Sequence, residues 1–176
     1  SSAASDVYKR QPIGNNDYKP SVARWNMATG EINPMPYEYP DLKKVRFIYA
    51  ASAEHQLYVQ CYTQYDLMTI CDFNGNLKCN IYGPKWVNEK TQTQHYSLGV
   101  EFCGDKILAL YSGGDHRTDA YYPTKFLVFD LNGNYLKTLE TGYMITDFCY
   151  DKENNRLIIN LNDEIQFAYL DLEGII

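Results

Sequence analysis

Side chains that could bind a ligand are concentrated in two short stretches of the chain, residues 84–95 and 113–123. The candidate ligand-binding residues are Trp86, His95, Asp115, His116, Arg117, Tyr121 and Tyr122. Aromatic rings can stack on a sugar or a peptide, while Arg, His and Asp side chains can hydrogen-bond its polar groups. We predict a binding surface here. The alternative is that both stretches are solvated loops that cover strand ends.

Chemistry beyond binding has weaker support. Asp115, His116 and Asp119 could ligate a metal, but their spacing is not diagnostic of any metal site. No G-x-S-x-G nucleophile motif is present. We therefore predict no catalytic residue, no metal and no cofactor, and we favour a non-catalytic protein over an enzyme.

A repeated turn indicates the elements that must position these residues. Asp-x-Asn-Gly-Asn occurs at 72–76 and at 130–134, and Asp-Leu-Glu-Gly occurs at 171–174, each after an apolar run. Asn-Gly between two such runs predicts a β-hairpin with a type I′ turn, in which both central residues have positive φ. The simplest role of the recurring Asp is to accept backbone N–H groups in the turn.

Apolar triplets add a second repeat. They begin at Leu57, Ile107 and Leu157, which are 50 residues apart, and each follows a turn. Before each turn stands a triplet of a charged residue, Phe and a small apolar residue; these triplets begin at Arg46, Glu101 and Asp147. If these charges point into a central channel, they form part of a charged ring; the alternative is opposite charges paired across a wet channel.

Four short antiparallel strands in a unit of about 40–50 residues indicate an all-β fold, a β-propeller built of four-stranded blades. We predict that residues 12–176 form a partial β-propeller of about three blades. Residues 22–36 end one blade, 42–84 and 96–141 are full blades, and 143–176 form a truncated blade. A ring of this kind closes to protect its strand edges, so we expect further blades.

Loop lengths predict which end of the blades carries the binding surface. The step from Leu57 to Asp72 is 15 residues, whereas the step from Ile107 to Asp130 is 23, so about eight residues are inserted near 113–123. The crossover near 84–95 also carries about eight extra residues. In a four-stranded meander both insertions lie at the same end of the strands.

The first eleven residues have a different character from the rest. SSAASDVYKRQ has neither strand nor helix periodicity, and it can be back-translated in full to a sequencing adapter with a transposon end. We predict that residues 1–11 are a disordered adapter artefact and that the natural sequence begins near residue 12.

Composition limits the partners. The net charge is -6 with both signs interspersed, which argues against nucleic acid, and no apolar run is long enough for a transmembrane segment. Five cysteines lie mostly in strand-like runs, where free buried thiols are expected; a Cys71–Cys79 disulfide is the alternative. In particular, Cys103 and Cys149 are predicted to occupy the position of Ile48.

The stretch from Ile107 to Leu172 contains YSG after a strand, then FLVFDLNGNYLKTLE and ITDFCYDKENNRLI. These segments resemble the TolB-like six-bladed β-propeller family that is abundant in Bacteroidetes. The resemblance implies six blades, export to the periplasm or outer-membrane surface, and often a lipoprotein anchor; it supplies no catalytic residues. The function expected is a binding or interaction propeller of the cell envelope, with an unknown glycan, peptide or envelope protein as partner. The alternative is a propeller hydrolase, lyase or lactonase with its site in the central funnel.

Overall fold

The computed structural model describes residues 5–12, 18–34, 42 and 45–176, with side chains from residue 23 onward. The predicted end of the first blade, at residue 36, lies outside the described residues. Strand bounds are β1 (Ser5–Pro12), β2 (Tyr18–Asn26), β3 (Glu31–Pro34), β4 (Phe47–Ser52), β5 (Leu57–Tyr62), β6 (Leu67–Asp72), β7 (Leu77–Tyr82), β8 (Thr93–Cys103), β9 (Lys106–Asp115), β10 (Lys125–Asp130), β11 (Tyr135–Glu140), β12 (Ile145–Asp151), β13 (Arg156–Leu161) and β14 (Phe167–Asp171). A 3₁₀ helix, η1 (Asp119–Tyr121), lies between β9 and β10.

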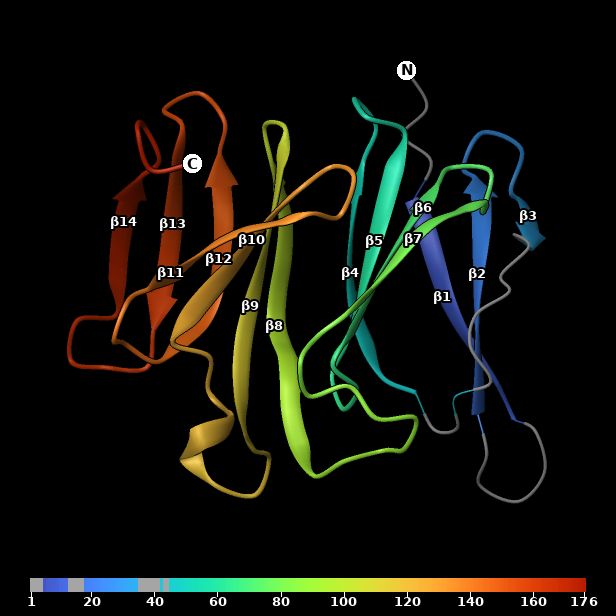
Figure 1. Ribbon diagram of the computed structural model, residues 1–176. Coiled ribbons are helices and arrows are strands. Elements are labelled where there is room, and N and C mark those ends of the chain that lie inside the picture. The colour runs from blue at the N-terminus through green and yellow to red at the C-terminus, as the bar shows by residue number, and fades with distance from the viewer. Residues whose placement is uncertain (1–4, 13–17, 35–41, 43–44) are drawn as a thin grey trace.

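The strands form antiparallel sheets with the orders β1-β2-β3, β4-β5-β6-β7, β8-β9-β10-β11 and β12-β13-β14. Figure 1 shows these sheets standing side by side in chain order, and β8 contacts both β4 and β12. The predicted all-β fold of four-stranded antiparallel blades is confirmed. Because each sheet is a local meander, most strand pairs are neighbours in sequence.

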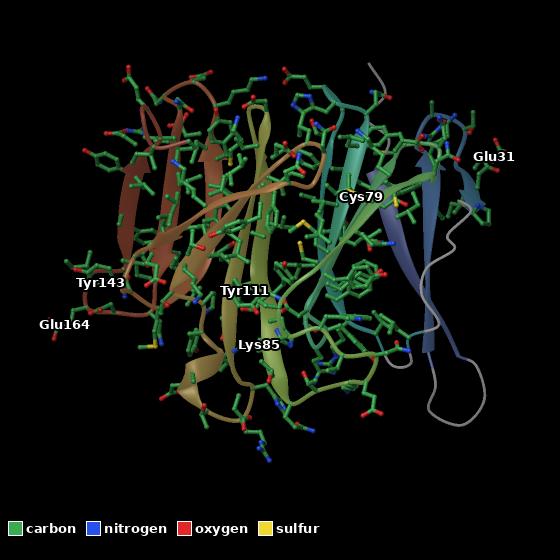
Figure 2. The ribbon with its side chains drawn as sticks, in the orientation of Figure 1. Glu31, Cys79, Lys85, Tyr111, Tyr143 and Glu164 are labelled. Carbon is green, nitrogen blue, oxygen red and sulfur yellow. The ribbon has the colours of Figure 1, made fainter. Side chains whose placement is uncertain are left out.

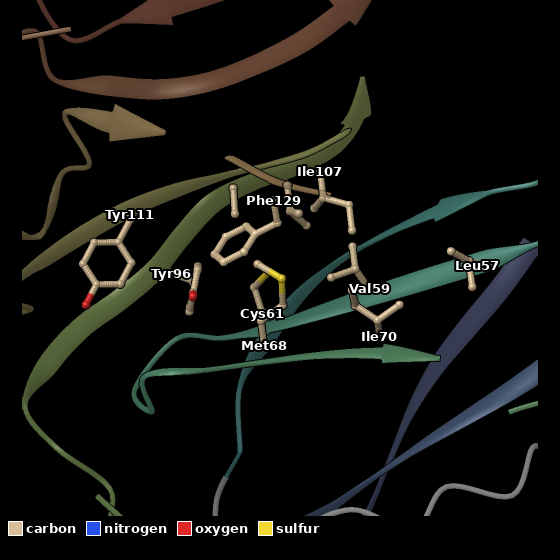
Figure 3. Close-up of a cluster of buried hydrophobic side chains, with 11 residues drawn as sticks. Leu57, Val59, Cys61, Met68, Ile70, Tyr96, Ile107, Tyr111 and Phe129 are labelled. Carbon is tan, nitrogen blue, oxygen red and sulfur yellow. The ribbon is translucent and has the colours of Figure 1, made fainter. Parts of the chain in front are cut away.

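Two hydrophobic cores hold the last three sheets together. One lies between β4–β7 and β8–β11, where Val59, Met68 and Ile107 are fully buried (Figure 3). The other lies between β8–β11 and β12–β14 and includes Leu108 and Leu157. A strand in the middle of such a stack buries both its faces, so the apolar run in β9 is continuous and does not alternate with polar residues.

Strand pairing shows that the predicted alignment of the apolar triplets was wrong by one residue. The repeated Asp of the hairpin turn pairs with Leu57 in the second sheet, with Lys106 in the third and with Arg156 in the fourth. Ile107 and Leu157 are therefore equivalent to Tyr58. A shift of one residue moves a side chain to the other face of a sheet. The continuous apolar runs concealed this shift because both faces are buried.

The same register separates the three charged residues that were predicted to form a ring. Glu101 pairs with Leu108, whose equivalent in the fourth sheet is Ile158. Asp147 instead pairs with Asn160, two residues beyond Ile158. Arg46 precedes β4 altogether. The three charges do not lie at one level of the stack, because they stand at different distances from the ends of their strands, which are Ser52, Cys103 and Asp151.

This register also corrects the prediction for two cysteines. Cys103 pairs with Lys106 and Cys149 pairs with Ile158, whereas Ile48 pairs with Cys61, so neither cysteine occupies the position of Ile48. Cys103 is buried but Cys149 is exposed. Cys149 lies on the face of the last sheet opposite the second core, beside the exposed Ile158. All five cysteines are free thiols, including Cys71 and Cys79.

The repeated hairpin turn contains a β-bulge and is not of type I′. Gly75 has a φ of 86°, while Asn74 is not among the residues of positive φ. The pairing register shifts between Ile70 and Cys71, as expected when a three-residue loop ends on a glycine in the left-handed region. Asp72 accepts hydrogen bonds from the backbone N–H groups of Asn74 (2.8 Å) and Asn76 (2.9 Å), which confirms its predicted role.

The first sheet includes part of residues 1–11, the stretch for which the sequence predicts a disordered artefact. The structure places Ser5–Pro12 in strand β1, antiparallel to β2, although no strand periodicity is present there. Backbone hydrogen bonds to an otherwise open strand edge require no particular side chains, so such pairing is independent of the sequence pattern. The adapter origin of residues 1–11 stays a prediction, and residues 1–4 lie outside the described part. The Arg24 guanidinium donates to the Phe73 carbonyl oxygen and ties this sheet to the second.

Candidate functional site

The structure brings the two predicted loop stretches together at one end of the sheets (lower part of Figure 1). Strands β8 and β9 extend beyond their neighbours, so Thr93 pairs with Asp115 and Gln94 with Gly114. The next residue continues this contact, because the backbone N–H of His116 donates to the Gln92 carbonyl oxygen (3.1 Å). The stretches are thus partly an extended hairpin rather than two independent loops.

The charged residues of the second stretch bind one another. Arg117 donates from Nε and Nη2 to the two carboxylate oxygens of Asp115, at 3.0 and 2.7 Å. These hydrogen bonds hold the pKa of Asp115 well below its usual range. His116 places Nδ1 2.9 Å from the Gln92 carbonyl oxygen. All three side chains are partly exposed, so they remain accessible while forming local contacts.

The aromatic residues of the stretches pack mainly against other aromatic rings. Trp86 contacts Tyr65 and Tyr82, with ring centroids 6.2 and 4.9 Å apart. The rings of Tyr121 and Tyr122, at the end of η1, lie 4.2 Å apart. Trp86 is partly buried against a small core beneath it.

His95 is placed differently from the loop position that the sequence predicted. It lies on β8 and is only 1% exposed. Its Nδ1 is 3.2 Å from the hydroxyl of Tyr111 and 3.7 Å from a carboxylate oxygen of Asp66. His95 therefore belongs to a buried polar cluster. It lies within the sheet because β8 begins at Thr93, before the predicted start of the blade at residue 96.

Asp66 is the centre of this cluster, and sequence reasoning did not identify it. The Tyr111 hydroxyl donates to Oδ1 of Asp66 at 3.2 Å, and the Lys85 backbone N–H donates to Oδ2 at 2.9 Å. Gly83 lies so close that an added Cβ would be 2.2 Å from the carboxyl group, which explains the glycine at this position. Figure 2 labels Tyr111 on β9 and Lys85 in the connection after β7, the two segments whose groups donate to Asp66.

Burial dominates the electrostatics of the cluster. It lowers the pKa of His95, although the negative charge of Asp66 acts in the opposite direction. It also raises the pKa of Tyr111 far above its usual value, and the neighbouring Asp66 adds to that effect. His95 and Tyr111 are thus neutral at pH 7. With the Tyr111 proton directed at Asp66, the Nδ1–H of His95 donates to the Tyr111 oxygen.

A pocket of about 340 Å³ lies beside this cluster, between the second and third sheets. Its lining residues come from the turn before β6, from β7 and the following turn, and from β8–β11: Asp66, Ile81, Tyr82, Gly83, Pro84, Tyr96, Tyr111, Lys125, Leu127, Phe129, Tyr135 and Thr138. Pro84 begins the first inserted stretch, and β10 follows the second. The pocket is therefore adjacent to both insertions, although none of the predicted ligand-binding residues lines it.

The pocket is lined by both buried and half-exposed aromatic rings. Tyr96, Tyr111 and Phe129 are at least 92% buried and belong to, or adjoin, the first core (Figure 3). Tyr82 on β7 is 50% exposed, and Tyr135 on β11 is 57% exposed. Tyrosines on adjacent sheets thus supply rings to one recess. The ammonium group of Lys125 lies 5.8 Å from the centroid of the Tyr111 ring.

An acidic pair lies elsewhere, between the third and fourth sheets. Burial raises the pKa of Glu101 on β8, and the nearby charge of Asp147 on β12 raises it further. Within the part of the chain that the structure describes, no group of three or more His, Cys, Asp or Glu side chains is arranged to hold a metal ion, and this includes Asp115, His116 and Asp119. Among the same residues, none forms a helix that is long and apolar enough to cross a membrane.

Known structures resemble this fold at low sequence identity. The extracellular domain of a putative one-component system from B. thetaiotaomicron, also described as a hybrid two-component system, matches with a TM-score of 0.60 and 10% identity over 93% of this chain and 20% of that chain. BamB from Moraxella catarrhalis, a propeller protein, matches with a TM-score of 0.51 and 11% identity over 86% of this chain and 39% of that chain. No family model and no curated protein matches the chain.

These likenesses show the fold alone, and together with the sheet order they define the class: the chain is part of a β-propeller. It spans about a fifth of the length of the first structure and less than half of the second. Similarity at this level of identity carries no activity from one protein to another.

Proposed function

We propose that this chain is part of a non-catalytic binding propeller that is exported and acts in the cell envelope. Its partner is a glycan, a peptide or another envelope protein. The observation that carries the proposal is the recess of about 340 Å³ beside the two inserted stretches. A concave, mostly aromatic site with a few polar groups on a rigid scaffold is typical of a ligand-binding site.

The comparisons support the location. One similar structure is the extracellular domain of a putative one-component system from B. thetaiotaomicron, and the other is BamB from Moraxella catarrhalis. The finer assignment to the six-bladed TolB-like family, with a Bacteroidetes origin and a lipoprotein anchor, is part of the same proposal. It rests on the strand and turn segments between Ile107 and Leu172.

The proposal is tested by applying the full chain to printed arrays of glycans and of peptides. We expect saturable binding to at least one class of probe. Trp86→Ala and Arg117→Ala test the inserted stretches, with Tyr143→Ala as a matched control because Tyr143 is a half-exposed aromatic residue outside the pocket. Absence of binding to every probe contradicts a glycan or peptide partner, the two classes that the arrays contain. Unchanged binding in both loop variants removes the predicted loop residues from the site.

A catalytic alternative has one observation in its favour, the raised pKa of Glu101 beside Asp147. A carboxyl group of raised pKa beside a second carboxyl group is the arrangement used for general acid–base hydrolysis. This alternative predicts turnover of ester, lactone or glycoside substrates that is lost in Glu101→Gln. If turnover is observed and Glu101→Gln leaves it unchanged, these two residues are not its source.

A further inference from the structure

The recess between the second and third sheets has the chemistry of a saccharide site. We propose that it binds one pyranose ring of a neutral saccharide, with Tyr82 and Tyr135 contacting the ring and Lys125 hydrogen-bonding its hydroxyl groups. This inference rests on the proposed function, because it names the ligand class of the binding propeller. None of these three residues was among those that the sequence predicted.

The exposed tyrosines supply the apolar contact. Tyr82 and Tyr135 are 50% and 57% exposed, yet both line the same recess and come from different sheets. A pyranose ring presents C–H groups on its faces, and these pack against aromatic rings at a low entropic cost because a tyrosine has few rotatable bonds. Tyr135 is held in place by its hydroxyl, 2.8 Å from the Thr138 hydroxyl, and by an edge contact with Phe129.

Charge on the recess suits the hydroxyl edge of such a ring. Asp66 lines the recess, but its side chain is only 1% exposed, so it acts on a ligand through its charge and not through a direct hydrogen bond. Lys125 contributes three N–H donors, and no ion pair with Lys125 is found among the described residues. These N–H groups can donate to neighbouring hydroxyl oxygens of one ring.

Size and charge narrow the ligand class. A recess of about 340 Å³ is at the lower end of the range for small-molecule sites, roughly 300–1,000 Å³. It therefore suits a single ring more than a folded peptide segment. The buried negative charge of Asp66 opposes a carboxylate or phosphate on the ligand, and the single nearby ammonium group of Lys125 offsets only one such charge. A neutral ring requires no further compensation.

The test measures binding of methyl glycosides of glucose, galactose and mannose to the full chain by ligand-observed NMR and calorimetric titration. We expect saturable binding of at least one. Tyr135→Ala weakens it by roughly tenfold, the upper range for loss of one aromatic contact. Lys125→Ala weakens it by about tenfold or more, because a charge-assisted hydrogen bond is lost, and Lys125→Gln restores part of the affinity.

Control and alternative outcomes separate this inference from the broader proposal. Tyr143→Ala leaves the affinity unchanged, because Tyr143 does not line the recess. If no neutral glycoside binds while the peptide array is positive, the saccharide inference fails and the binding function stands. Glycoside binding that is unaffected by both Tyr135→Ala and Lys125→Ala places the site elsewhere and overturns the inference. Methyl glucuronide binding more than tenfold tighter than methyl glucoside overturns the neutral class.

Discussion

Replacing the buried carboxylate of Asp66 by an amide tests the polar cluster directly. Asp66→Asn has nearly the same shape, so it changes the hydrogen bonds with little change in packing. In the native protein both carboxylate oxygens accept a hydrogen bond, one from the Tyr111 hydroxyl and one from the Lys85 backbone N–H. The amide retains one acceptor and turns an N–H₂ group toward the second donor.

The magnitude follows from the burial. Asp66 is 1% exposed and Tyr111 is 8% exposed, so water does not replace the lost partner. A buried donor left without an acceptor costs about 1–3 kcal/mol, and a hydrogen bond to a charged group contributes about 1.5–3 kcal/mol. We expect Asp66→Asn to lower the unfolding free energy by about 2–3 kcal/mol. That is a large share of the stability of a domain of this size.

The assay is urea unfolding followed by tryptophan fluorescence, with the midpoint compared at an unchanged m-value. Tyr111→Phe removes one donor, and the double variant measures the coupling between the two side chains. We expect a coupling energy of about 1 kcal/mol, as for residues that share a hydrogen bond. A loss below about 0.5 kcal/mol in Asp66→Asn, or a coupling of zero, would refute the central role given to this carboxylate.

Further predictions concern the neighbouring glycine, the buried histidine and the thiols. Gly83→Ala places a methyl group 2.2 Å from the buried carboxyl group of Asp66. We expect the unfolding free energy to fall by about 1–3 kcal/mol in the same urea assay. An unchanged midpoint would contradict the close approach. Burial lowers the pKa of His95, so the unfolded chain takes up a proton first as the pH falls below about 6.5. Stability should therefore decrease as the pH falls from there to the lower folded-state pKa. This decrease should be smaller in His95→Gln, and an equal pH dependence in both proteins would count against a buried neutral His95. A thiol reagent should modify the exposed Cys149 rapidly in the folded chain and Cys61 only on unfolding, because Cys61 is fully buried and its pKa is raised by burial. Mass spectrometry of digested peptides would show the order of modification. Early modification of Cys61 would contradict the prediction.

The four-stranded meander could be predicted because its determinants are local. The turn at 72–76 and its copy at 130–134 each place a glycine at the position of positive φ. Each turn also begins with an Asp that accepts backbone N–H groups. The position of the two inserted stretches at one end of the sheets also follows from counting residues between repeats. Both conclusions depend on spacing along the chain and not on contacts between sheets.

The candidate site could be predicted only in part. Trp86, Asp115, His116 and Arg117 lie in the inserted stretches as expected, and their polar contacts are local. His95 is buried because β8 and β9 extend beyond the length that the repeat suggests. The apolar triplet at Ile107 gave the wrong register because both faces of that strand are covered.

The sequence by itself determined the all-β repeat, the turn positions and the end of the sheets that carries the longer connections, because each depends on backbone preferences over a few residues. Only the tertiary structure decided that Asp66, Tyr82, Lys125 and Tyr135 share one recess. These residues lie in different repeats, and a pocket between two sheets depends on how the sheets pack. The physical reason is that packing joins residues distant in sequence, and no local pattern along the chain records which of them will meet.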